Sequence, residues 1–226
     1  MVSEWLRLAA IVSIVLAILC ALALLVDLVR RPQPMWIMNA VWPLTALYAG
    51  PLALLAYFWF GRAPARTGSR SGRHHHHGEK KFWQATLVGA THCGAGCALG
   101  DFVAEWLAFA TGFALLGSAM AGRFLLAFVL AYLAGVFFQY FSIAPMRGLG
   151  LRDGLVAAIK ADTLSLIAFE IGMFAWMIIS HAALFPGLEP TSFVFWWMMQ
   201  VAMLLGLATT YPVNWWLIRA GVKEAM

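Results

Sequence analysis

The chain of 226 residues is 63% hydrophobic and only 11% charged, with a mean hydropathy of +0.82. A soluble domain has about a quarter of its residues charged, so this composition excludes an ordinary soluble protein and indicates an integral membrane protein. The formal net charge of +5 does not indicate nucleic-acid binding, because the basic residues cluster beside the ends of apolar segments, where they orient membrane helices.

Apolar runs long enough to cross a hydrocarbon layer of about 30 Å recur along the chain. Because every backbone polar group must be paired inside the bilayer, such runs predict helices rather than a barrel. The predicted spans are Trp5–Leu28, Met35–Phe60, Phe82–Ala110, Phe124–Ala144, Thr163–Leu184 and Phe193–Ile218. The expected fold class is therefore all-α: a single integral membrane domain over residues 1–226, a polytopic helical bundle of about six transmembrane helices.

Two segments between the predicted spans are more polar. Residues 61–81, between the second and third spans, are basic and rich in Gly and Ser, which is typical of a flexible loop. The run His74 to His77 in this loop predicts capture of metal ions, and a solvated tether that contacts anionic lipid is the alternative. Met146 to Asp162 is predicted to be an amphipathic connector between the fourth and fifth spans.

The basic residues predict an orientation. With the N-terminus in the cytoplasm, all but three of the 15 Lys and Arg residues fall on the cytoplasmic side, which predicts that both termini are cytoplasmic. The exceptions are Arg30, Arg31 and Arg123, and the adjacent pair fits this orientation poorly. We expect a multi-pass protein of the bacterial inner (plasma) membrane.

The stretch "HCGAGCALGDFVAE" in the third span concentrates ionisable and metal-ligating side chains. Residues four apart lie on nearly the same face of a helix. One stripe therefore contains Cys93, Cys97, Asp101 and Glu105, and the adjacent stripe contains His92, Gly96 and Gly100. A rise of about 1.5 Å per residue places the two thiols near the middle of the bilayer, Asp101 in the outer third and Glu105 near the headgroups.

Three interpretations of this stretch remain open. His92, Cys93, Cys97 and Asp101 could bind a soft ion, since thiolate and imidazole suit copper or zinc. The thiols could instead perform redox chemistry, although a CxxxC spacing on a regular helix does not point the sulfurs directly at each other. Finally, the small residues could be only a packing face, with Gly96 and Gly100 forming a surface for another helix or for a homo- or hetero-oligomer.

Glu170 is the deepest carboxylate in the predicted spans. Met173, Met177 and His181 follow it on one helical face. An isolated charge at this depth is costly, so Glu170 needs a partner, and it is predicted to be a second metal ligand or a proton carrier.

Several stretches resemble a family of membrane proteins known as domain of unknown function 4396. They are "WPLTALYAGPLALLAYFWFG", "THCGAGCALGDFVAE" and "YPVNWWLIRAGVKEAM", with "EPTSFVFWW" before the last. The likeness extends from Met35 to Met226. The resemblance supports the assignment as a membrane protein and implies no catalytic residue.

The functional prediction follows from the ligand-type residues in the predicted spans and from the enzyme motifs that the sequence does not contain. The sequence has no GxxxxGK[ST], HExxH or GxSxG motif, so ATP-driven transport by this chain alone and two hydrolase classes lack support. The leading hypothesis is a protein that binds or transports a transition metal ion through Cys93, Cys97, His92, Asp101 and Glu170. The alternatives are a non-transporting assembly or accessory protein and an integral thiol oxidoreductase, the one enzymatic option.

Overall fold

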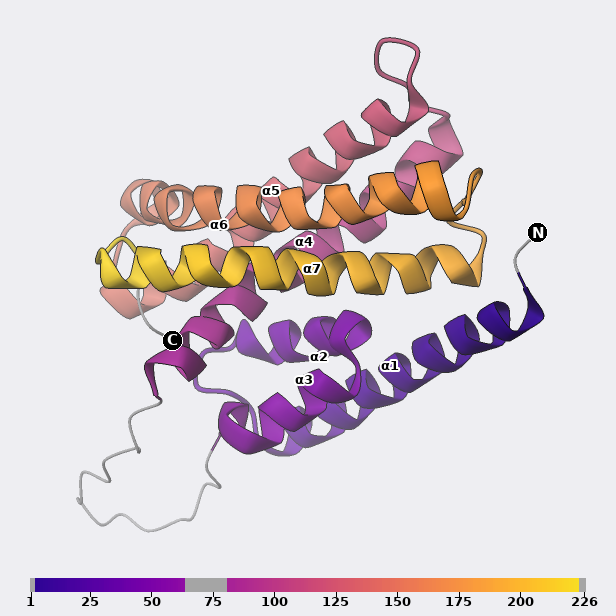
Figure 1. Ribbon diagram of the computed structural model, residues 1–226. Helices are drawn as coiled ribbons and strands as arrows, with labels where there is room; N and C mark the ends of the chain where they lie inside the picture. Colours follow the sequence, from indigo (N-terminus) through magenta and orange to yellow (C-terminus); the bar gives the residue numbers. More distant parts are fainter. Residues whose placement is uncertain (1–2, 64–80, 224–226) are drawn as a thin grey trace.

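The computed structural model describes residues 3–63 and 81–223, and its regular elements are helical (Figure 1). In chain order they are α1 Glu4–Arg30, α2 Met38–Ala49, α3 Pro51–Ala56, η1 Tyr57–Gly61, α4 Phe82–Thr111, α5 Ala119–Arg147, α6 Leu151–Ile179, η2 Ser180–Leu184 and α7 Phe193–Arg219. The two η elements are single π-helical turns that continue α3 and α6. The all-α prediction is confirmed.

Five of these helices are long and apolar enough to cross a membrane: α1, α4, α5, α6 with η2, and α7. They lie alongside one another in Figure 1, and the shortest of them has 27 residues. At about 1.5 Å per residue, 27 residues extend about 40 Å, which exceeds the hydrocarbon thickness. Five of the predicted spans are therefore present as continuous helices.

The predicted second span is wrong, because the chain breaks at Gly50. Gly50 has φ +53° and ψ −126°, a conformation that residues with a Cβ avoid, and Pro51 follows it. The 12 residues of α2 and the apolar helix Pro51–Gly61 are each too short to cross the bilayer. In Figure 1, α2 enters the bundle from one end and α3 returns to that end, so the two form a re-entrant hairpin. Hydropathy alone did not distinguish this hairpin from one continuous span.

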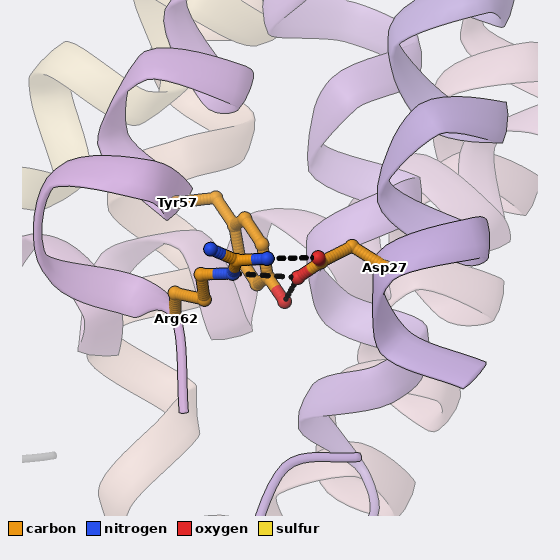
Figure 2. Close-up of polar contacts among 3 residues, drawn as sticks. All are labelled: Asp27, Tyr57 and Arg62. Atoms are coloured by element: carbon orange, nitrogen blue, oxygen red, sulfur yellow. Dashed lines mark hydrogen bonds and ion pairs between the residues drawn. The ribbon is translucent and has the colours of Figure 1, made fainter. Parts of the chain in front are cut away.

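A salt bridge fastens the returning half of the hairpin to α1 (Figure 2). Arg62 pairs with both oxygens of Asp27: Nη2 donates to Oδ1, and Nε donates to Oδ2 at 3.0 Å. The hydroxyl of Tyr57 also donates to Oδ2, at 2.8 Å. The Asp27 carboxylate raises the pKa of the Arg62 guanidinium by hydrogen bonding. This bidentate pair fixes the geometry as well as the charge where α1 meets η1.

The predicted connector between the fourth and fifth spans is also wrong. The helix α5 continues to Arg147 and ends at Gly148, whose φ of +61° terminates the helix. The next helix begins at Leu151 and runs without interruption to Ile179. Asp162, predicted to end the amphipathic connector, is instead 0% exposed inside α6.

The glycine face of α4 packs within the chain. A Cβ on Gly96 would lie 2.8 Å from Cα of Gly135, and one on Gly100 would overlap the backbone of Ala131. Both neighbours belong to α5, so α4 and α5 approach backbone to backbone, as small-residue membrane interfaces allow. The predicted oligomer contact through Gly96 and Gly100 is therefore not available on this face, which α5 already covers.

A matched pair of glycine substitutions tests this packing. Gly100→Ala should destabilise the protein by about 1–3 kcal/mol, the usual cost of overpacking a close contact, because the new methyl meets the α5 backbone. Gly89→Ala, on the same helix, has no atom nearer than 3.8 Å and should stay within about 0.5 kcal/mol of the parent. Thermal unfolding in detergent measures both. Equal unfolding temperatures for the two variants would contradict the packing.

Candidate functional site

Five buried side chains of α4 and α6 form what we call the carboxylate–thiol line. Its members are Cys93, Cys97, Asp101, Asp162 and Glu170, and each is no more than 2% exposed. The helix α4 is central in the bundle and contacts α2, α5, α6 and α7. The third predicted span thus carries its ionisable side chains into the protein interior.

The line is organised in two levels along the helices. Asp162 lies beside Cys93, and Glu170 lies beside Cys97 and near Asp101. Because α4 and α6 are separated by one antiparallel helix, they run in the same direction. Eight residues separate Asp162 from Glu170 on α6, which corresponds to about 12 Å, whereas four residues separate Cys93 from Cys97 on α4, about 6 Å. One thiol and at least one carboxylate meet at each level.

The three carboxylates are buried without hydrogen-bond partners. Within residues 3–63 and 81–223, neither oxygen of Asp101, Asp162 or Glu170 has a partner in hydrogen-bonding geometry. A buried carboxylate is costly unless it is protonated, hydrated or neutralised by a cation. Ionisable groups inside membrane bundles mark ion and proton pathways for this reason.

The re-entrant hairpin adds a hydroxyl to the line. Tyr48, in the last turn of α2, is 4% exposed and lies within electrostatic range of both thiols. Its hydroxyl oxygen is 2.7 Å from the position that a Cβ on Gly94 would occupy. The absence of a side chain at Gly94 therefore lets Tyr48 approach α4 between Cys93 and Cys97.

The structure brings together four of the five predicted ligands and separates the fifth. Cys93, Cys97, Asp101 and Glu170 belong to the line, whereas the ring of His92 lies against Phe138 of α5, with ring centroids 6.0 Å apart. In the part of the chain that the structure describes, no three His, Cys, Asp or Glu side chains converge to hold a metal ion. The predicted histidine capture site, His74 to His77, lies outside the described residues.

At the end of the bundle that carries the α4–α5 loop, a cavity lies about one turn of α4 beyond Asp101. Glu105 is 4% exposed, not solvated as its predicted depth suggested, and its Oε2 has no partner among the described residues. It lines a cavity of ≈ 220 Å³ together with Arg123, His181 and Glu189. Met173 and Met177 are buried between Glu170 and this cavity, so the predicted face of α6 is continuous as far as His181.

Sequence reasoning assigned no role in the site to Asp162, Tyr48 or Lys223. Lys223 is 2% exposed near the opposite end of the line. A signal for Asp162 exists. Gly154, Ala158, Asp162 and Ser165 are spaced three or four apart and are all buried, which is the small-residue face of one continuous helix. No comparable local pattern marks Tyr48 or Lys223, because tertiary packing brings them to α4.

The fold and the site define a multi-pass helical membrane protein with an ionisable interior. The chain belongs to the family described as Domain of unknown function (DUF4396), whose model matches residues 82–223. This match confirms the resemblance. The matched residues span α4 to α7 and include every member of the carboxylate–thiol line. The helix α1 and the re-entrant hairpin lie before the matched residues. No curated protein and no solved structure matched the chain.

Proposed function

We propose that this protein transports a divalent transition-metal cation, with Zn(II) as the best-fitting ion, along the carboxylate–thiol line. The observation that carries the proposal is the placement of three unpartnered carboxylates beside two thiols in the interior of a membrane bundle. Zn(II) accepts both thiolate sulfur and carboxylate oxygen. Cu(I) suits the thiols alone.

The two-level arrangement favours passage of an ion. At each level an approaching cation meets one thiol and at least one carboxylate, and the two levels are about 6 Å apart along α4 and about 12 Å apart along α6. Conduction requires binding that is favourable enough for the ion to arrive and weak enough for it to leave. Because metal ligands must give up protons, we expect uptake to be accompanied by proton release.

The re-entrant hairpin also changes the proposed orientation. Figure 1 places the N-terminal and C-terminal ends at opposite ends of the bundle. The C-terminal end carries most basic residues: Arg30, Arg31, Arg62, Lys81, Arg147, Arg152, Arg219 and Lys223. Near the other end, the described chain has Arg7 and Arg123. We propose that the C-terminal end is cytoplasmic, which removes Arg30 and Arg31 as exceptions to the positive-inside rule.

An assembly or accessory protein is the second candidate function. The close packing of Gly96 and Gly100 on α5 favours it, since this packing accounts for part of the α4 sequence without any ligand.

A thiol oxidoreductase is the third candidate function. Both thiols are at most 1% exposed, so a mixed disulfide with a partner protein requires the bundle to open. Acid trapping of cells tests it, and the absence of any mixed disulfide of Cys93 or Cys97 would count against it.

Zinc uptake into proteoliposomes tests the transport proposal. The double variant Cys93→Ser/Cys97→Ser should lower the initial rate by roughly tenfold, the factor produced by about 1.4 kcal/mol of lost binding. Glu170→Gln should act in the same direction. Cys20→Ser removes a thiol from α1, outside the line, and Asp153→Asn removes an exposed carboxylate from the first turn of α6, away from the cavity. Both controls should transport normally. An unchanged rate in the double variant, with normal protein levels, would favour the accessory protein.

Single-cysteine labelling tests the orientation. In a variant that lacks Cys20, Cys93 and Cys97, Ser3→Cys should react with a membrane-impermeant maleimide from outside intact cells. Val222→Cys should react only after the cytoplasmic side is opened, because the basic end of the bundle faces the cytoplasm. Reaction of both cysteines from the same side would refute the orientation.

A further inference from the structure

The chain after α7 turns back and buries a lysine. Gly221 adopts φ +71°, and the backbone nitrogens of Val222 and Lys223 both donate to the carbonyl of Leu217, at 3.0 and 3.2 Å. This turn points the Lys223 side chain into the bundle, where the residue is 2% exposed. Lysine is rarely buried to this degree unless acceptors surround its ammonium group.

The ammonium group lies at the end of the carboxylate–thiol line. Its Nζ donates to the backbone carbonyl of Gly89 at 3.4 Å. Gly89 is four residues before Cys93, so it occupies the next position on the stripe of α4 that carries both thiols. Asp162 is within electrostatic range of Lys223. The ammonium therefore stands where a cation would enter or leave the first level of the line.

The surroundings of Lys223 are acceptors held in place by other contacts. The side-chain oxygen of Asn214 and Cε of Lys223 lie 3.9 and 3.8 Å from the same point, the position of a Cβ on Gly89. Asn214 is fixed by the hydroxyl of Ser165, which donates to this oxygen at 3.2 Å, and by its own amide, which donates to Thr210. A carbonyl, an amide oxygen and a carboxylate are groups that stabilise a positive charge.

We propose that Gly89, Asn214 and Asp162 form a cation-binding position, that the ammonium of Lys223 occupies it at rest, and that the transported cation displaces this ammonium. The inference rests on the proposed function and adds a competitor for the ion within the chain. A tethered group competes at an effective concentration in the millimolar range. Lys223 therefore sets the zinc concentration at which this end of the line becomes occupied.

Zinc uptake by Lys223→Met tests the competition. The substitution keeps an unbranched apolar side chain and removes the charge, so half-maximal uptake should require roughly tenfold less zinc. Lys160→Met removes an exposed charge from α6 and should leave the zinc dependence unchanged. Lys223→Arg keeps a positive charge and should resemble the parent. An unchanged zinc dependence in Lys223→Met would overturn the proposal.

A double-mutant cycle separates this inference from the proposed function. The unfolding temperatures of Lys223→Met, Asp162→Asn and the double variant are measured in detergent, with no transport involved. Substitutions of groups that interact have non-additive effects on stability. The unfolding temperature of the double variant should therefore fall by less than the sum of the two falls in the single variants. Strict additivity would overturn the cation position whatever uptake shows. If Lys223 and Asp162 are coupled in unfolding temperature but the protein moves no zinc, transport is refuted and the position of the ammonium remains supported.

Discussion

The cost of holding carboxylates in an apolar interior is the constraint on which this structure depends. Asp101, Asp162 and Glu170 are buried in a bundle whose outer surface is apolar, and within the described residues their oxygens have no partner in hydrogen-bonding geometry. A group in that position must take up a proton, water or a cation. Each of these three states is reversible, and reversible exchange is what a transport pathway requires. Asp27 shows the contrast, since Arg62 and Tyr57 pair it completely, and it holds two elements together.

Two packing arrangements make the carboxylate–thiol line possible. The glycines of α4 bring α5 into backbone contact on one side, which leaves the thiol stripe to face α6. On another side, the half-length hairpin packs α2 on α4 and places Tyr48 against Gly94. The salt bridge at Asp27 anchors the hairpin at its open end, where Arg62 follows η1. The fold thus places small residues where α4 and α5 approach closely. It places ionisable residues where α4 faces α6.

The sequence predicted the membrane class, the stripe of Cys93, Cys97 and Asp101, and the importance of Glu170, because apolar length and helical spacing are local properties. It failed at Gly50, where one backbone conformation turns an apolar run of sufficient length into a hairpin. It also failed at Asp162, since nearby glycines and charges resembled an amphipathic connector. The sequence did not indicate that Tyr48 and Lys223 lie at the line, because both join it only through contacts between elements far apart in the chain.

Zinc X-ray absorption spectroscopy of the protein loaded with one equivalent of Zn(II) tests the central claim most directly. If the carboxylate–thiol line holds the ion, the spectrum should contain a sulfur shell at about 2.3 Å beside oxygen or nitrogen neighbours at about 2.0 Å. The sulfur shell should disappear in Cys93→Ser/Cys97→Ser and persist in Cys20→Ser. A spectrum of the parent protein with oxygen and nitrogen neighbours alone would contradict the account.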